Sequence, residues 1–383
     1  MSARLWIRCG TLLDGSGGPP RHDATVEIVG DRIRSVGLDE PARRDGMTLD
    51  WRAHTVLPGL VDAHDHLTLD VGDEELQSRE PSLWTALRGA GNAQRILRAG
   101  VTTVRDCGAK AHVDLRLRTA IVAGLIEGPR LLVSGTPLTI VGGQCWFLGG
   151  AVDSPAGIRR LVREQIDAGV DFIKVFVTGG VATRGTELLR AQFSDDELRL
   201  VVEEAHAGGR PVIAHCHGGP GARAAIAARV DSIEHGVFLA REDLEAMAAY
   251  GIPLVVTFGV YERLAASAEL EPAAREQCEK VVDRYVETIA AARDVKVTIA
   301  VGTDTVHADL AAELRALIQA GFTPLEAVVA ATAHGASVCG LADAGRVEPG
   351  MRADVLAVRG DPLADVSALR DVAHLVQDGA PRW

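Results

Sequence analysis

The chain has 383 residues and a formal net charge of −12 at pH 7, and 47% of its residues are hydrophobic but only 4% aromatic. This charge disfavours a nucleic-acid or anionic-membrane partner, and no apolar run approaches the roughly 20 residues that span a bilayer. The six scattered cysteines are typical of reduced thiols, and the N-terminus lacks the apolar segment of a secretory signal. We therefore expect a soluble, cytoplasmic protein.

The two chain ends share one pattern. Residues 1–57 contain runs of alternating character, LWIRCGTLLD and ATVEIVGDRIRSVG, with Gly30-Asp31 as a turn. Such alternation is typical of antiparallel strands, and it returns near the C-terminus in RADVLAVRGD and VAHLVQDG. We expect residues 1–57 and 345–383 to form one small β-sandwich domain assembled from both termini.

Residues 58–344 alternate short apolar runs with helical stretches. The strand candidates are VDAHDH (61–66), TTVRD (102–106), RLLVSG (130–135), DFIKVF (171–176), PVIAHC (211–216), SIEHG (232–236), PLVVTF (253–258) and VTIAVGTD (297–304). Short apolar strands that alternate with helices indicate a parallel sheet covered on both sides. Eight such units fit a (β/α)8 TIM-type barrel of the α/β class, and an open doubly wound sheet is the alternative.

Candidate metal ligands end several of these strands. His64 and His66 are two residues apart on the first strand, so their side chains point the same way, and neutral imidazoles can hold one metal ion. Two unrelated histidines are equally consistent with this pair alone. Further candidates at later strand ends are Lys174, His215, His235 and Asp304. Because barrel active sites lie at the carboxyl ends of the strands, these positions favour the barrel.

The stretches PGLVDAHDH, DFIKVF, AHCHG, SIEHG and VGTDT, in this order, resemble the metal-dependent amidohydrolase superfamily. GPRLLVSGTPLTIVGG, DFIKVFVTGG and QFSDDEL resemble its branch of bacterial prolidases and arginine- or lysine-releasing carboxypeptidases. The resemblance covers essentially the whole chain. It implies a dipeptidase-like hydrolase of an amide bond in a small-molecule substrate, and we expect a homo-oligomer.

The resemblance also implies two divalent metal ions, which we expect to be zinc. The implied ligands are His64, His66 and Asp304 for the first ion, and His215 and His235 for the second. Lys174 would bridge the two as an N-carboxylated lysine. Charge counting supports the bridge, because two divalent cations and burial both disfavour a protonated amine. A lysine that extends its ammonium group to solvent is the alternative for Lys174, and a helix N-cap is the alternative for Asp304.

The implied mechanism is hydrolysis by metal-activated hydroxide. Metal binding lowers the pKa of water toward about 7, and Asp304 would take its proton and pass it to the leaving amine. Substrate contacts are expected from His217, two residues beyond His215, and from His307. Carboxypeptidase-like members of the branch tend to have a histidine where this chain has Gln144, and an amide carries no charge. Recognition of a dipeptide carboxylate is therefore weaker here.

Other interpretations use the same residues. A deaminase or a cyclic amide or lactone hydrolase would need the same metal site, whereas a catalytically silent metal-binding barrel would not need Asp304 as a base. Residues 259–282 are charged and helical, which fits a lid over the site or a solvated helix equally well. Asp62, Asp65 and Asp106 flank the strand ends and are candidates to orient the ligand histidines.

Overall fold

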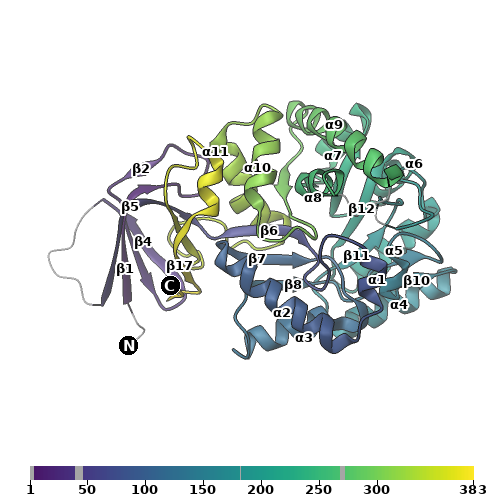
Figure 1. Ribbon diagram of the computed structural model, residues 1–383, viewed down its shortest axis with the longest axis horizontal. Coiled ribbons are helices and arrows are strands. Elements are labelled where there is room, and N and C mark those ends of the chain that lie inside the picture. The colour runs from purple at the N-terminus through teal and green to yellow at the C-terminus, as the bar shows by residue number, and fades with distance from the viewer. Residues whose placement is uncertain (1–3, 39–45, 182, 268–271) are drawn as a thin grey trace.

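The computed structural model describes residues 4–38, 46–181, 183–267 and 272–383. A sheet built from both chain ends lies at one end of the molecule, and the remaining strands and helices form a larger part beside it (Figure 1). No helix of the described chain is long and apolar enough to cross a membrane.

Eight strands form the frame of the larger part, and every predicted run overlaps one of them. They lie in two parallel sheets, β6-β7-β8 and β11-β12-β13-β14-β15. Their bounds are β6 Leu60–Asp65, β7 Val101–Asp106, β8 Arg130–Val133, β11 Ile173–Phe176, β12 Val212–Gly218, β13 Ser232–Phe238, β14 Leu254–Val256 and β15 Ile299–Val301. The residues of these strands are almost all buried, as those of parallel strands covered on both faces must be.

The predicted closed barrel is seen only in part, because the two sheets do not share a continuous ladder. Within the described chain, isolated bridges join them: Leu138 pairs with Val175 at one seam, and Asp65 with Asp304 at the other. At the first seam the chain beyond β8 lies beside β11, where the Leu138 N–H donates to the Lys174 carbonyl at 2.8 Å.

The second seam is a close approach of two backbones. A Cβ added at Gly302 would lie 2.5 Å from the Cβ of His64, so only glycine fits there. The Asp304 N–H donates to the His64 carbonyl at 2.7 Å. This seam therefore brings the end of β15 directly against the histidines of β6.

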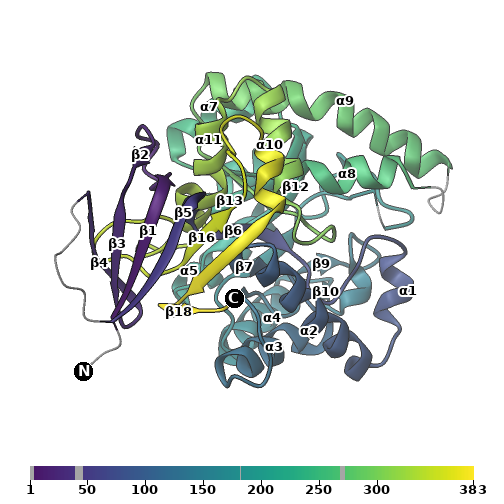
Figure 2. The same cartoon turned by 60° about the vertical axis from the view of Figure 1, so that its left-hand side comes forward.

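Helices pack around these strands (Figure 2). Their bounds are α1 Glu74–Ser78, α2 Ser82–Arg98, η1 Lys110–His112, α3 Val113–Val122, η2 Trp146–Leu148, α4 Pro155–Ala168, α5 Asp195–Ala207, α6 Gly219–Ala228, α7 Arg241–Tyr250, α8 Phe258–Ala265, α9 Pro272–Asp294, α10 Leu310–Gln319, α11 Pro324–Val329, η3 Ala330–His334, α12 Gly335–Val338 and η4 Val366–Arg370. Local sequence sets the limits: α5 begins with a capping box of Ser194 and Glu197, and α4 ends at Gly169 with φ 86°. β9 Thr139–Ile140 and β10 Ala151–Val152 form a separate pair.

The two chain ends do meet in one sheet of eight strands, and the predicted sandwich is not confirmed by the described residues. The order is β18-β17-β16-β5-β1-β3-β4, with β2 on β1. The bounds are β1 Arg4–Leu12, β2 Arg21–His22, β3 Thr25–Val29, β4 Arg32–Gly37, β5 Met47–Pro58, β16 Val355–Val358, β17 Val372–Gln377 and β18 Ala380–Pro381. β5 and β16 join the ends, with Leu57 opposite Leu356. Alternation shows that a strand has one buried face, but it does not specify what covers that face.

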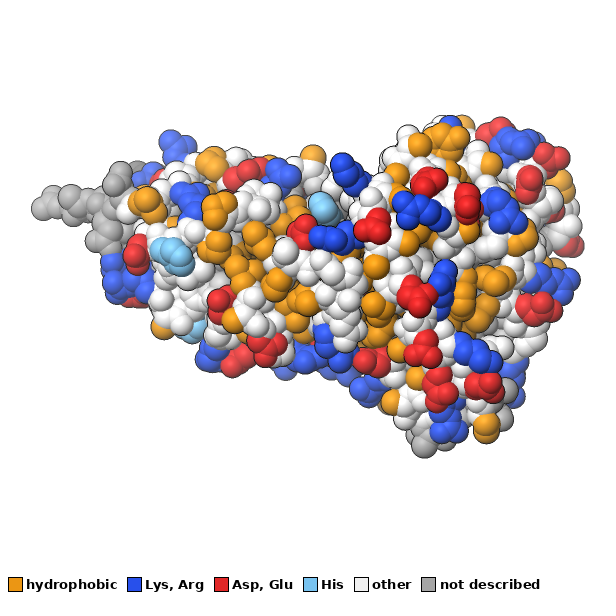
Figure 3. All heavy atoms as spheres, turned by 90° about the horizontal axis from the view of Figure 1, so that it is seen from above, with side chains coloured by type: hydrophobic (Ala, Val, Ile, Leu, Met, Phe, Trp, Pro, Cys, Tyr) orange, Lys and Arg blue, Asp and Glu red, His pale blue; other side chains and the backbone are white. Residues whose placement is uncertain are grey.

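The sheet of the chain ends has an apolar cluster of its own, which includes Ile7, Val26 and Trp51. The domain division that we placed at 57/58 and 344/345 stays a prediction, and residues 39–45 lie outside the described residues. On the face shown in Figure 3, acidic and basic side chains lie beside one another. The exposed ion pair of Lys280 with Glu276 is an example, and solvent screens such pairs strongly.

Candidate metal centre and active site

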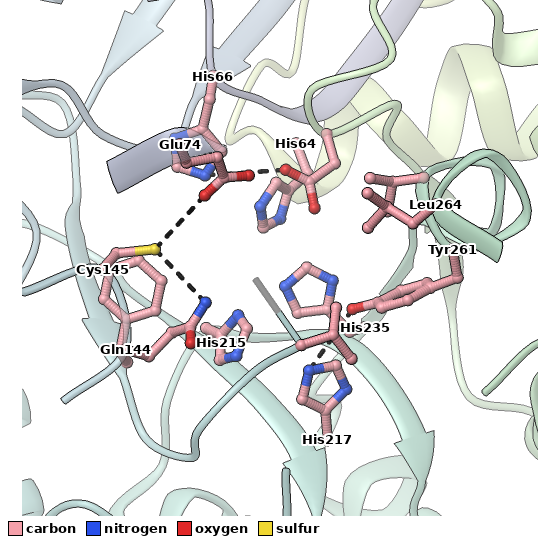
Figure 4. A pocket seen from close by; sticks show the side chains of 14 residues that line it. His64, His66, Glu74, Gln144, Cys145, His215, His217, His235, Tyr261 and Leu264 are labelled. Atoms are coloured by element: carbon pink, nitrogen blue, oxygen red, sulfur yellow. Dashed lines mark hydrogen bonds and ion pairs between the residues drawn. The ribbon is translucent and has the colours of Figure 1, made fainter. Parts of the chain in front are cut away.

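The predicted metal ligands lie together where the parallel strands end (Figure 4). We call them the ligand cluster: His64 in β6, His66 just after it, Lys174 in β11, His215 in β12, His235 in β13 and Asp304 after β15. One ligand atom each of His64, His66 and Asp304 lies within 4.8 Å of the others. Lys174 Nζ is 3.2 Å from His64 Nε2, and the His215 and His235 ring centroids are 4.5 Å apart. Apart from Asp304, these side chains are buried.

Two imidazoles of the cluster are oriented by backbone carbonyls. His66 Nδ1 donates to the Gly108 carbonyl at 3.0 Å, and His215 Nε2 donates to the Gly179 carbonyl at 3.1 Å. A carbonyl only accepts, so each of these nitrogens carries the hydrogen. The opposite nitrogen of each neutral ring therefore holds a lone pair that is available to a metal.

His64 is oriented by a buried ionic network. Its Nδ1 lies 2.7 Å from Glu234 Oε2, and Arg105 Nη2 donates to Glu234 Oε1 at 2.9 Å. The arginine occupies one oxygen of this carboxylate, and the other accepts from His64 Nδ1. His64 Nε2 is then the lone-pair nitrogen, and it faces Lys174.

His235 is oriented by a hydroxyl. Its Nδ1 lies 2.7 Å from Thr257 Oγ1, and the Thr257 N–H donates to the Tyr285 hydroxyl oxygen at 2.9 Å. His235 Nε2 is buried and has no hydrogen-bond partner within the described chain. Buried polar atoms are almost always paired, so this nitrogen points to a group that the protein itself does not supply.

The three aspartates that we expected to orient the ligand rings contact backbone and other side chains instead. Asp62 accepts from the backbone and hydroxyl of Thr303. Asp65 accepts from the backbone of His66 and the ring of His307, and Asp106 accepts from the backbone of Gly108. Asp62 also accepts from the backbone N–H of His64 at 3.2 Å. Two of the three aspartates therefore hold the backbone of a cluster histidine, while the ring partners are the glutamate, threonine and two carbonyls described above.

Burial sets the protonation of the cluster. It lowers the pKa of His66 to about 3 and pushes those of His64, His215 and His235 well below the ordinary value, and the charge of Lys174 adds to each shift. All four rings are therefore neutral, the form that binds metals. Burial also raises the pKa of Asp304 to about 7, although Lys174 opposes the shift.

Two cluster residues have backbone conformations that L-amino acids rarely adopt. φ is 70° at His235 and 55° at Asp304. A non-glycine residue in this region costs of order 1–3 kcal/mol and is typical of functional sites.

The cluster, apart from Lys174, forms the floor of a cavity of about 450 Å³, including its open mouth. Two sides of the cavity differ in character (Figure 4). On the polar side lie Glu74 of α1, Gln144 and Cys145. On the apolar side, α8 contributes Val260, Tyr261 and Leu264, and the Tyr261 hydroxyl lies 3.5 Å from His217 Nε2.

Residues 55–381 match the model of the amidohydrolase family. The chain belongs to the amidohydrolase family. It is therefore a hydrolase, and its ligand cluster is a candidate divalent-metal site of the kind typical of this family.

Similar proteins include ochratoxinase from Aspergillus niger, which is 32% identical over a 418-residue alignment that covers 97% of this chain and 85% of that enzyme. A solved Xaa-Pro dipeptidase with bound methionine superposes with a TM-score of 0.93 at 29% identity, covering 99% of each chain. A prolidase complexed with N-methylphosphonate-L-proline gives 0.92 at 27% identity, again over 99% of both chains. These neighbours agree with the prolidase-like branch of the amidohydrolases and with an α/β, TIM-like barrel fold.

The predicted substrate contacts divide into two groups. His217 and Gln144 line the cavity of this amidohydrolase, and burial lowers the pKa of His217 to about 3. His307 is not among the described residues that line it. Its Nδ1 contacts Asp65 at 2.8 Å and its Nε2 donates to the Leu69 carbonyl at 2.8 Å, so the ring connects two loops.

Sequence reasoning missed several residues of the cavity. Tyr261 and Leu264 follow the seventh strand, where barrel active sites lie, so their position was an available clue. The sequence placed them only within residues 259–282, the candidate lid or solvated helix, without naming either residue, and residues 268–271 lie outside the described residues. Glu74 belongs to a short acidic helix between two strands and has no comparable clue.

Proposed function

We propose that this amidohydrolase is a binuclear, zinc-dependent hydrolase of an amide bond in a small, peptide-like or N-acyl amino acid substrate. The observation that carries the proposal is the ligand cluster itself. It holds four buried neutral imidazoles. In each ring one nitrogen is hydrogen-bonded to the protein, and the other is left for a metal. A structural role would not need His235 Nε2 to be buried without a partner.

The donor set fits two divalent ions. His64, His66 and Asp304 would hold the first, and His215 and His235 the second. Imidazole and carboxylate donors of this kind suit zinc. When bound, the metals would supply an activated water and polarise the scissile carbonyl.

Lys174 would complete the site as a carbamate. Its neutral amine adds to CO₂ and releases one proton, which creates an anion with two oxygens. The position supports this role, since Lys174 Nζ is buried 3.2 Å from His64 Nε2 and lies on the strand next to that of His215. A second anion beside Asp304 would offset the charge of two cations.

Asp304 would carry the proton. Its side chain is 16% exposed, which leaves the carboxylate accessible to both water and substrate. It would accept the proton of the attacking water and donate it to the leaving nitrogen.

The apolar side of the cavity favours an apolar or aromatic group next to the scissile amide. Val260, Tyr261 and Leu264 provide the contact area. Gln144 offers only neutral hydrogen bonds to a carboxylate. Aromatic substrates should therefore be cleaved faster than dipeptides that end in lysine or arginine.

The test combines metal content with turnover. Protein produced with added zinc should hold about two equivalents by elemental analysis and hydrolyse members of a panel of N-acyl amino acids and dipeptides. Chelation should remove metal and activity together. A fully active protein with one equivalent would contradict the binuclear site. Turnover of amino-purines, cyclic amides or lactones alone would favour the alternative chemistry, and two equivalents without any turnover would favour a silent barrel.

A further inference from the structure

Glu74 is the one carboxylate on the polar side of the cavity that the proposed chemistry leaves unused. It is the first residue of α1, and Asp73 caps this helix by accepting from the Leu76 N–H at 2.9 Å. The cap fixes where the helix begins and so aims the Glu74 side chain at the cavity, toward Cys145 and Gln144 (Figure 4).

The Glu74 carboxylate lacks a strong partner. Within the described chain, its one polar contact is the Cys145 thiol, with Sγ 4.0 Å from Oε2. A thiol is a weak donor. Other glutamates nearby are paired: Glu75 contacts Arg79 at 2.6 Å and Glu80 contacts Arg88. Glu74 is half-buried. Bulk water therefore only partly makes up for the absence of a paired cation among the described residues.

The charges of the cavity make a cationic ligand group the best complement. No arginine or lysine is among the described residues that line it. Burial raises the pKa of Glu74 to about 8, and repulsion from Asp304 adds to the shift, so a cation beside this carboxyl group would offset both effects. A substrate carboxylate on the polar side would add a further negative charge there. A substrate ammonium would be attracted and would supply the missing hydrogen-bond donors.

We propose that Glu74 binds the α-ammonium group of an aminoacyl substrate while the apolar side chain of that substrate packs against Val260 and Leu264. This inference rests on the proposed function and specifies its substrate: an amide of an apolar amino acid with a free amine. The polar and apolar sides face each other across the ligand cluster, so the two contacts hold the scissile carbonyl between them.

The experiment compares two amides that differ only in the amine. L-phenylalanine p-nitroanilide carries it, and 3-phenylpropanoyl p-nitroanilide lacks it. The wild type should prefer the first. Glu74→Gln should lower kcat/KM for the first about ten- to a hundredfold, because a charge-assisted hydrogen bond is lost, and should leave the second within about twofold. Glu75→Gln is the matched control, one residue along the same helix and paired with Arg79, and should change neither rate.

Binding separates this inference from the proposed function. L-Phenylalaninamide and 3-phenylpropanamide should be titrated calorimetrically into zinc-loaded wild type and Glu74→Gln. If neither anilide is cleaved but the amine-bearing amide binds about tenfold or more tightly, and only when Glu74 is present, the proposed hydrolysis fails and the role of Glu74 stands. Equal loss of both rates in Glu74→Gln, a wild-type preference for the ligand without an amine, or no binding of either amide would overturn the role of Glu74.

Discussion

The ligand cluster and the sides of the cavity above it are built in different ways. Cluster residues lie on strands or directly after them, and four of the rings are fixed by hydrogen bonds to Glu234, Thr257 and two backbone carbonyls. The residues around the mouth come from segments between strands, such as α1 and α8. Strands shared by the whole fold hold the chemistry, whereas the connecting segments provide the contacts that choose a substrate.

This difference has a physical consequence. A change in the cluster should affect every substrate, because it alters the metals or the proton transfer. A change in a residue on the sides of the cavity should alter the ratio of kcat/KM between substrates, because it removes contacts that only some substrates make. The following variants test whether the two regions separate in this way.

The largest effect is expected for Lys174→Ala. Without the bridging anion the protein should lose at least one metal equivalent by elemental analysis, and activity on all substrates should fall to near background. Short carboxylic acids such as acetate or propionate should restore part of it by taking the place of the carbamate. Lys110→Ala is the control, since Lys110 Nζ donates to the Ser78 carbonyl outside the cavity. Full metal content and full activity in Lys174→Ala would be incompatible with the bridge.

Asp304→Asn should reduce kcat about 10²–10⁴-fold, the usual contribution of a general acid–base group. The amide keeps a ligand oxygen, so metal content should remain near that of the wild type. Steady-state kinetics on two substrates with different leaving groups, together with elemental analysis, measures both quantities. A variant with wild-type kcat would show that another group moves the proton.

Thr257→Val should weaken metal binding without touching a ligand. Valine has nearly the same shape but leaves His235 Nδ1 without its partner at 2.7 Å. Loss of such a partner typically costs 10–100-fold in metal affinity, measurable by competition with a chelator. Thr257→Ser restores the hydroxyl and should restore affinity. If the Thr257→Val and Thr257→Ser variants bind metal equally well, the hydroxyl does not orient the His235 ring.

The same contrast explains what could be predicted from the sequence. Members of the ligand cluster such as His64 and Lys174 could be picked out as candidates because each ends an apolar run, and strand order brings such ends together. The eight strands were predicted for the same reason. The seams between the two parallel sheets could not be predicted, because the close approach of Gly302 to His64 depends on tertiary packing. Glu74 was missed because its position is set by a short connecting helix rather than by a periodic pattern.

His307 has a second role open to it besides the predicted substrate contact. It follows Asp304 by three residues, which suggested a substrate contact, yet its ring connects Asp65 to the Leu69 carbonyl. Burial alone would lower its pKa, but Asp65 and Asp70 outweigh burial and raise the pKa to about 10. The folded protein therefore binds a proton at His307 more tightly than the unfolded chain does, where the pKa is about 6.5.

His307→Gln should consequently act on stability, with a distinct pH dependence. Glutamine can donate a hydrogen bond but carries no charge, so we expect the free energy of unfolding to fall by about 1–3 kcal/mol at pH 6. Because the folded-state pKa is raised, the stabilisation is fully present below pH 6.5 and is lost as the pH rises through about 10. The difference in free energy of unfolding between wild type and variant, measured by urea denaturation, should therefore shrink between pH 6 and pH 10.

The ratio of kcat/KM between aromatic and Xaa-Arg substrates should stay unchanged in His307→Gln, since His307 is not among the described residues that line the cavity. A changed ratio with unchanged stability would return His307 to the substrate-binding side.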